Sequence, residues 1–596
     1  MNVSRRFGWL LLCLLLSACA GTQFSGGASG ELSRVLKDYD AWLAKNDINR
    51  VIFSDAGLKP LPALTAESAA ARAGQLHHMK TRLAAIRERS LARHELRIKR
   101  VLALWLEQRW LQARHDLLEM HSAPPRLART TEALAARIRS ADAGSAQAMD
   151  VVRHWMLAYS NHLQQQADKL QRQAAAGVRI PQPLIHRVQQ GFERNAALWL
   201  DALRQFNQRL ADVDKQIAKD FQREINEWSN TALQQSLQAV NAVFDDQYRA
   251  AAPKEGGLWQ HEGGKQYYRV QLKHYLGVED DPHNLLLQAQ GYVAELEQAI
   301  AGVRRQLNFK GSREDFQEYL ANNPARYAGR FNTAKDQLLN TAAELSQAMQ
   351  RYFNRQPRTP FAVLPLDQPA SGAGYYSPAS PQQRIGIFWL DVEDLPNTLN
   401  GELAYLAAHE LIPGRHFLYS LQREQHWLPG ALTQPEPNDA FLMAWSEYAA
   451  WLAEESGVLN TPLERYGRLS IALRQAAVAV VDIGINFYRW SFEDAEHFLA
   501  EFTLAGEGRK QSEDAFWETM EMTVLAQPGL STAHHLGFRR IRDLRDQSKG
   551  VLKRRFDIAQ FHDFILANGS VPMPLLDELV NDYIDDVRSG RTRRGL

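Results

Sequence analysis

The sequence predicts a mainly α protein, built as a bundle of many helices with one small β element. Apolar side chains recur at the i, i+3, i+4, i+7 spacing of a buried helical face from the start of the mature region. The stretch from about residue 60 to 250 is rich in Ala, Leu, Gln, Arg and Glu, which favour helices, and contains few breakers. Residues 384–390 form the best strand candidate in the chain.

Size and composition allow a large core and exclude one class of function. The chain has 596 residues, of which 45% are hydrophobic, and a formal net charge of +1. A nearly neutral chain argues against nucleic-acid binding, which needs a strongly basic surface. The two cysteines, Cys13 and Cys19, both lie near the N-terminus. The mature protein is therefore expected to have neither a disulfide nor thiolate chemistry.

The N-terminus has the pattern of an export signal. Arg5 and Arg6 precede an apolar run over residues 7–16, which is shorter than the roughly 20 residues that span a bilayer. Leu16-Ser17-Ala18-Cys19 follows directly. This segment resembles a bacterial lipoprotein signal, which implies cleavage after residue 18 and lipid attachment to Cys19. The alternative is an ordinary secretory signal in which Cys19 is incidental.

The same resemblance predicts where the protein resides. Ala20, and not Asp, follows the cysteine, which favours an outer-membrane lipoprotein facing the periplasm of a Gram-negative cell. Residues 19–30 are then the lipidated cysteine and a Gly/Ser-rich tether.

Helical patterns fill most of the remaining chain. The first amphipathic stripe comprises Leu32, Val35, Leu36, Tyr39, Trp42 and Leu43, and residues 101–120 are similar. We expect long antiparallel helices over residues 31–250, because no strict heptad persists. A loop containing Pro253 and four glycines separates this part from residues 251–596. Beyond it we expect helices over 285–307 and around 316–320, the strand at 384–390, and helix again from Ser446.

The most informative segment is His409-Glu410-Leu411-Ile412-Pro413-Gly414-Arg415-His416. In a His-Glu-x-x-His zinc helix, two histidines one turn apart hold the metal and the Glu activates the attacking water. Here Pro413 takes the place of the second histidine. On a straight helix His409 and His416 would lie about 10 Å apart along the axis, too far to share one zinc ion. A Pro-Gly break could fold His416 back toward His409.

The surrounding motifs carry a family resemblance over nearly the whole mature chain. They are Tyr375-Tyr376-Ser377-Pro378, Gly386-Ile387-Phe388, His409-Glu410-x-x-Pro413-Gly414-x-His416, Val481-Asp482-x-Gly484, Pro528-Gly529 and Asn568-Gly569-Ser570-Val571-Pro572. In this order they resemble the bacterial family called domain of unknown function 885, with its His-Glu-x-x-Pro-Gly-His-His hallmark. The resemblance implies one family domain over about residues 31–590. It also implies a mostly helical zinc metallopeptidase whose bundle encloses a deep cleft.

The departures from the family pattern fall on chemically capable positions. Arg415 stands where the family has the first His of Pro-Gly-His-His, and Met443 where it has a Glu that is its plausible third metal ligand. Asn486 replaces a histidine, Val478 an arginine and His534 a tyrosine. Scaffold residues match while several site residues do not.

The resulting site hypothesis assigns a role to each candidate. His409, His416 and Glu447 are the predicted zinc ligands, with Glu447 one helical turn after Met443. Glu410 is the predicted general base, and His534 or Arg415 is predicted to stabilise an oxyanion.

Other interpretations of these residues stay open. The strand with Gly386 and Phe388 is predicted to lie beside the metal-type helix and to pair with a substrate backbone, as edge strands do in zinc peptidases. Glu447 as an exposed helix carboxylate, and His534 as a structural histidine, are the alternatives.

Two functions follow from the sequence. The first is a lipid-anchored, zinc-dependent peptide hydrolase of the cell envelope. The second is a non-catalytic descendant whose cleft binds peptides or an envelope partner. The changes at Arg415 and Met443 favour the second, and the retained His409 and Glu410 favour the first. The oligomeric state is not specified by any pattern in the sequence.

Overall fold

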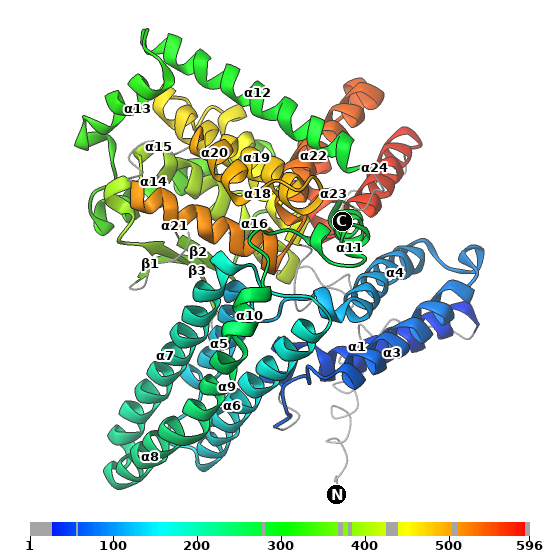
Figure 1. The fold of residues 1–596 in the computed structure, drawn as a ribbon. Coiled ribbons are helices and arrows are strands. Elements are labelled where there is room, and N and C mark those ends of the chain that lie inside the picture. The colour runs from blue at the N-terminus through cyan, green and yellow to red at the C-terminus, as the bar shows by residue number, and fades with distance from the viewer. Residues whose placement is uncertain are drawn as a thin grey trace, which may run out of the picture.

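The computed structural model is mainly helical with one small sheet, which confirms the predicted fold class (Figure 1). It describes residues 27–54, 58–276, 281–366, 374–379, 384–424, 439–502 and 509–590. The signal sequence and the lipidation candidate Cys19 lie outside these described residues.

Three helices at the N-terminal end form a layer of their own: α1 (Ala28–Asn46), α3 (Ala66–Ala85) and α4 (Arg93–Arg114). The first helix begins at Ala28, so the last three residues assigned to the tether are helical instead. The reason is tertiary, because Ser29 donates a hydrogen bond to Glu95 of α4 and thereby holds the first turn against its neighbour.

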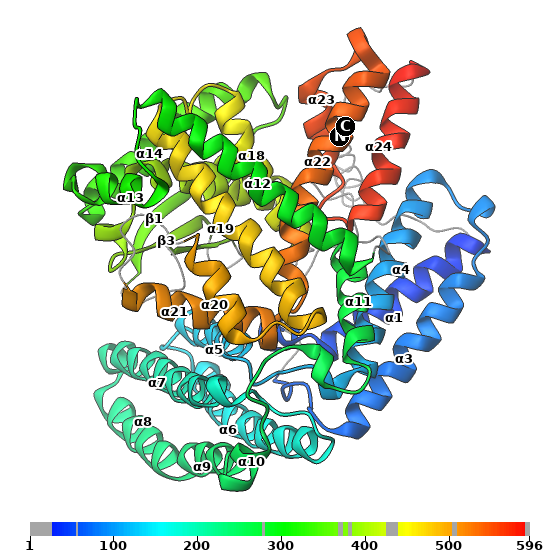
Figure 2. The same ribbon diagram turned by 45° about the horizontal axis from the view of Figure 1, so that its top comes forward.

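The predicted long helices form an elongated bundle that projects from the body of the molecule (Figures 1 and 2). Its members are α5 (Pro124–Arg139), α6 (Ala146–Ala175), α7 (Gln182–Val213), α8 (Lys215–Trp228) and α9 (Gln234–Val243). Pro124 stands at the start of α5, where a missing N–H costs nothing. Trp155, Trp199 and Phe206 fill the bundle interior.

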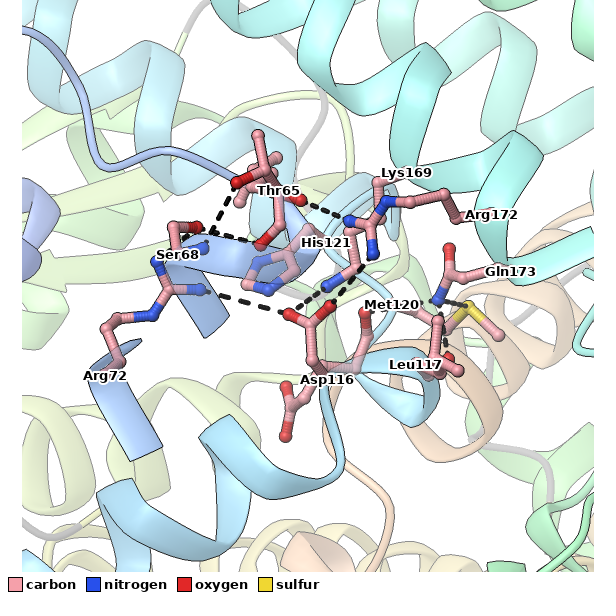
Figure 3. A network of polar contacts seen from close by, with 12 residues as sticks. Thr65, Ser68, Arg72, Asp116, Leu117, Met120, His121, Lys169, Arg172 and Gln173 are labelled. Carbon is pink, nitrogen blue, oxygen red and sulfur yellow. Dashed lines mark hydrogen bonds and ion pairs between the residues drawn. The ribbon is translucent and has the colours of Figure 1, made fainter. Parts of the chain in front are cut away.

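A cluster of charges joins this bundle to the N-terminal layer (Figure 3). Asp116 accepts a hydrogen bond from the buried Lys169 of α6 at 2.9 Å, and Arg172 and Arg72 lie 3.7 and 4.0 Å from the same carboxylate. Both arginines also donate to the loop that precedes α3, to the carbonyls of Leu64 and Ala63 respectively. We call Asp116 and these three cations the Asp116 clasp. Each of its members has a partner.

The larger body is formed by the C-terminal half. Its helices are α11 (Gly264–Leu276), α12 (Pro282–Gln306), α13 (Arg313–Ala321), α14 (Phe331–Ala348), α15 (Asn400–Leu406), α16 (Arg415–Glu424), α18 (Asp439–Glu455), α19 (Pro462–Phe487), α20 (Phe492–Ala500), α21 (Arg509–Met520), α22 (Leu530–Leu552), α23 (Ile558–Ala567) and α24 (Met573–Arg588). The helices predicted over 285–307 and around 316–320 are α12 and α13, so both predictions are confirmed.

One helix passes a membrane-span test by length and composition. Among the described residues, α19 alone is long and apolar enough, yet 78% of its most apolar stretch is buried inside the protein. It begins with a capping box in which Thr461 and Glu464 satisfy each other's backbone amides. We therefore interpret α19 as the central core helix, packed against α12 and α15.

The apolar side chains form two cores that do not divide the chain at residue 250. One core combines the N-terminal layer with α12–α16, the sheet and much of α18–α24. The other combines the projecting bundle with α11 and parts of α19, α21 and α22. Since α19 and α22 contribute to both, the two cores meet along these helices.

The strand prediction is confirmed, but its place in the sheet is not the predicted one. The sheet has the order β1-β3-β2, with β1 (Phe361–Leu366) parallel and β2 (Gly374–Ser377) antiparallel to β3 (Gly386–Asp391). Because β3 is the central strand, Ile387–Leu390 are paired with a neighbouring strand on both sides, and Phe388 is fully buried. The expected edge-strand position is therefore not observed, and substrate contact by Gly386 and Phe388 stays a prediction.

Candidate metal centre

The helix that carries His409 ends as the Pro-Gly pair predicts. After α15 the chain forms a π-helical turn over Ala407–Leu411, and Ile412 is extended because Pro413 disfavours the helical conformation before it. Gly414 then lies so close to the turn that a Cβ there would be 1.9 Å from the carbonyl oxygen of His409. Only glycine permits this return of the chain. The indole of Trp445, on α18, donates a hydrogen bond to the Pro413 carbonyl and fixes the bend against that helix.

Three potential metal ligands converge beside this bend. His409 from the π-helical turn, Glu447 from α18 and His534 from α22 each offer one ligand atom, and these atoms all lie within 4.8 Å of one another. All three side chains are buried. Among the described residues, this is the one group of His, Cys, Asp or Glu side chains that lie close enough together to hold a metal ion.

In each of these side chains one atom that could bind a metal lacks a hydrogen-bond partner. They are His409 Nε2, His534 Nε2 and Glu447 Oε1, and the last has Arg468 Nη1 at 4.0 Å. A buried polar atom without a partner costs free energy, so three in one place call for a ligand. A zinc ion with bonds of about 2.1 Å holds its ligand atoms roughly 3.4 Å apart, within the 4.8 Å limit inside which these atoms lie. The residues fit zinc.

The other polar atoms of the same side chains are held in place. His409 Nδ1 lies 2.8 Å from Glu410 Oε1, and the Tyr405 hydroxyl donates to Glu447 Oε2 at 3.1 Å. The His534 ring is hydrogen-bonded to the backbone of Met443. The Tyr405 ring stacks on the His409 ring, with centroids 5.0 Å apart. Each candidate ligand thus has one atom fixed by the protein and one atom free to bind, as metal ligands in proteins usually do.

Burial sets the protonation states. It lowers the pKa of His534 well below its ordinary value, and the nearby charges of His409, His535 and Arg415 act in the same direction. His534 is therefore neutral and able to ligate. Burial raises the pKa of Glu410, but the Arg415 charge and the His409 hydrogen bond outweigh it and leave that pKa below its ordinary value.

The helix that carries His534 is anchored by Asp482 of α19. Its carboxylate accepts hydrogen bonds from the backbone amides of Gly529 and Thr532, at the N-terminus of α22, where a negative charge is favourable. Burial raises the pKa of Asp482 to about 6. Asn486 donates to Asp482 and to the Thr523 carbonyl. Asp482 and Asn486 therefore position the site.

His416 is not close to this group, which corrects one predicted ligand. Its Nδ1 lies 2.8 Å from the Tyr376 hydroxyl of β2, and its ring is also hydrogen-bonded to the backbone of Thr359. Burial lowers the pKa of His416 to about 4. The Pro-Gly bend does turn the chain back, but it directs His416 toward the sheet and Arg415 toward Glu410.

His534 takes the place that His416 was expected to fill. It was predicted from the sequence as an oxyanion donor, but the structure places it among the candidate metal ligands instead. No spacing in the sequence relates His534 to His409, since α22 reaches the site only through tertiary packing. Glu447 is buried and not an exposed helix carboxylate.

Two of the five residues that depart from the family pattern, Arg415 and Met443, contact each other. Arg415 Nη2 donates to Met443 Sδ at 2.8 Å, and Arg415 Nε lies 3.5 Å from Glu410 Oε2. Arg415 thus spans the bend and α18, and its side chain is 19% exposed. Its predicted contact with substrate stays a prediction.

Comparison with known proteins identifies the family. The bacterial proteins of unknown function called DUF885 match residues 54–580. This chain belongs to that family. No curated protein matches the chain.

Two solved structures share the fold over nearly their whole length. A candidate lipoprotein from Colwellia psychrerythraea has a TM-score of 0.82 at 20% identity, over 94% of this chain and 99% of that one. A candidate lipoprotein of unknown function from Shewanella oneidensis has a TM-score of 0.70 at 16% identity, over 94% and 100%. At sequence identities of 20% and 16%, these two comparisons show a shared fold.

Proposed function

We propose that this protein is a lipid-anchored protein of the cell envelope that binds one zinc ion through His409, Glu447 and His534 and does not hydrolyse peptides. The observation that carries the zinc site is the convergence of three buried side chains, each with an atom that lacks a hydrogen-bond partner. Two imidazoles and one carboxylate are a common zinc ligand set. The fourth position would accept a donor atom from a peptide, the ligand class that the family resemblance implies.

The absence of hydrolysis is inferred from the direction of Glu410. A general base must lie within hydrogen-bond reach of the proton that it takes. The Glu410 carboxylate instead contacts His409 Nδ1, on the opposite side of the ring from the Nε2 atom that would face the metal. Its other oxygen faces Arg415.

Peptide hydrolysis is the second candidate, and the ligand set favours it. Zinc sites with three protein ligands, including the His-His-Glu set, keep a position open and are typical of catalytic centres. In that case zinc would polarise the scissile carbonyl.

Zinc analysis of the purified protein tests the site. We expect about one zinc per chain in the wild type, as in single-ion zinc proteins, and little in His534→Ala or Glu447→Ala. His535→Ala is a matched control, because His535 is the next residue on α22, is equally buried, and packs against the Tyr292 ring, outside the group. His416→Gln should also keep its zinc. A wild type without zinc after supplementation, or zinc loss only in His416→Gln, contradicts the proposed site.

Peptide digestion separates the two candidates. The zinc-loaded wild type should leave a mixed peptide library intact. Cleavage that disappears in both His534→Ala and Glu410→Gln would establish the hydrolase instead.

The lipid anchor is proposed from the Leu16-Ser17-Ala18-Cys19 sequence, and the names of the two structural relatives support it. Labelled palmitate should enter the wild type and fractionate with the outer membrane. Cys19→Ser should take up no label, and equal labelling of this variant would refute the anchor.

A further inference from the structure

We propose that Glu410 is a positioning residue, which fixes the His409 ring for the metal while Arg415 in turn fixes Glu410. Chemically, Glu410 sets which nitrogen of His409 carries the proton. This inference rests on the proposed zinc site and assigns a new role to the Glu beside the first ligand.

The first support is the arrangement around the His409 ring. Nδ1 lies 2.8 Å from a carboxylate oxygen, and Nε2 is buried without a partner. A carboxylate only accepts hydrogen bonds, so Nδ1 carries the proton and Nε2 presents its lone pair. This is the tautomer that a metal ligand requires. The stacked Tyr405 ring restricts the remaining rotation.

The second support is the environment of Arg415. Its guanidinium lies 3.5 Å from the second Glu410 oxygen, and its other contact is the uncharged sulfur of Met443. The ion pair with Arg415 and the hydrogen bond with His409 Nδ1 hold the Glu410 carboxylate between these two side chains. Arg415, Glu410 and His409 therefore form one chain of contacts that ends at a candidate metal ligand.

The third support is the backbone that brings these residues together. Arg415 directly follows Gly414, whose close approach to the His409 carbonyl returns the chain over the turn. The contact between Arg415 and Glu410 thus depends on the Pro-Gly bend. The bend serves to place Arg415, and not a second ligand, next to the His409 turn.

Zinc affinity in the full chain, measured by competition with a chelator, tests the role. Glu410→Gln should weaken zinc binding by about 10- to 100-fold, the usual effect of losing such a partner of a ligating histidine. Arg415→Met should weaken it by less than about tenfold, because it acts only through Glu410. Glu455→Gln is the control, since Glu455 lies on α18 and pairs with Arg545. It should bind zinc as the wild type does.

A second measurement does not depend on zinc. In the metal-free protein with ¹⁵N-labelled histidine, the His409 signals, identified by their loss in His409→Gln, should show a protonated Nδ1. Glu410→Gln should convert them to a mixture of tautomers. A change in folding alone would not select this one ring.

Three outcomes are separable. Unchanged zinc affinity with an unchanged tautomer in Glu410→Gln overturns the positioning role. Full zinc affinity combined with loss of peptide cleavage in Glu410→Gln also overturns it, because Glu410 would then be the general base. A wild type that binds no zinc but shows the tautomer change refutes the proposed function while leaving the control of the His409 ring by Glu410 in place.

Discussion

The Asp116 clasp and the group of His409, Glu447 and His534 are both buried and polar, yet their atoms are partnered differently. In the clasp, Lys169 is 1% exposed and its ammonium has a carboxylate at 2.9 Å (Figure 3). In the second group three atoms have no hydrogen-bond partner, and Glu447 Oε1 has only Arg468 at 4.0 Å. Buried polar atoms that satisfy one another join elements of the fold, whereas buried atoms that face one another without partners fit a site for something else.

The largest expected effect on stability comes from removing the carboxylate of the Asp116 clasp. Asp116→Ala leaves Lys169 buried without its counter-ion, which we expect to cost about 3–5 kcal/mol in the free energy of unfolding. Urea unfolding measures it. Lys169→Met is the matched control and should cost much less, because it removes the buried charge itself. Equal losses in the two variants would show that packing, and not charge, holds the layers together.

Acid should weaken the bundle that the clasp joins. Burial lowers the pKa of His162, on α6, to about 4, whereas an unfolded chain protonates histidine near 6.5. The unfolded state therefore takes up the proton first, and stability falls as the pH drops from 6.5 to 4, by at most about 3 kcal/mol. His162→Leu should reduce the slope of the stability profile in this range, to which the other buried histidines also contribute. A profile of unchanged slope would contradict the assignment.

The stabilisation of the folded protein by zinc should depend on the group of His409, Glu447 and His534 and not on the Asp116 clasp. At a free concentration 100 times its dissociation constant, a ligand of the folded state adds about 2.7 kcal/mol. Thermal unfolding with and without zinc should show this gain in the wild type and in Asp116→Ala, but not in His534→Ala. An equal gain in His534→Ala would place the zinc elsewhere.

The smallest expected effect on stability comes from a substitution of Glu447 in the metal-free protein. Glu447→Gln should change the stability of the metal-free protein by less than about 1 kcal/mol, because its amide oxygen can still accept the hydrogen bond of the Tyr405 hydroxyl. A further reason is that Arg468 is 4.0 Å from Glu447 but has a closer partner in Glu454, at 2.6 Å. The same variant should lose zinc. A large loss of stability without zinc would mean that Glu447 serves the fold, as Asp116 does.

The helical fold was predictable because helix formation has a local signature. The spacing of Leu32, Val35 and Tyr39 repeats that of α1, and Pro413-Gly414 marks the end of the His409 turn at the residue where it occurs. The strand at β3 was found for the same reason. Its central place in the sheet was not predicted, because strand order depends on β1 and β2, which the sequence pattern did not identify.

The site was only partly predictable. His409 and Glu447 are members of the group, as expected, and His416 is not. The two histidines of the Pro-Gly segment are close in sequence, so local reasoning paired them. His534 reaches the site through the packing of α22 on α18 and the anchoring of its first turn by Asp482.

The sequence alone determined the helical class, the family pattern, the bend at Pro413-Gly414 and the lipoprotein-like N-terminus, since each is written in neighbouring residues. Only the tertiary structure decided which side chains meet. A one-residue difference along the bend points Arg415 at Glu410 and His416 at the sheet, and a distant helix supplies the third candidate ligand. Local spacing fixes the direction of a side chain relative to its own helix, but the position of that helix is set by burial of apolar surface over the whole chain.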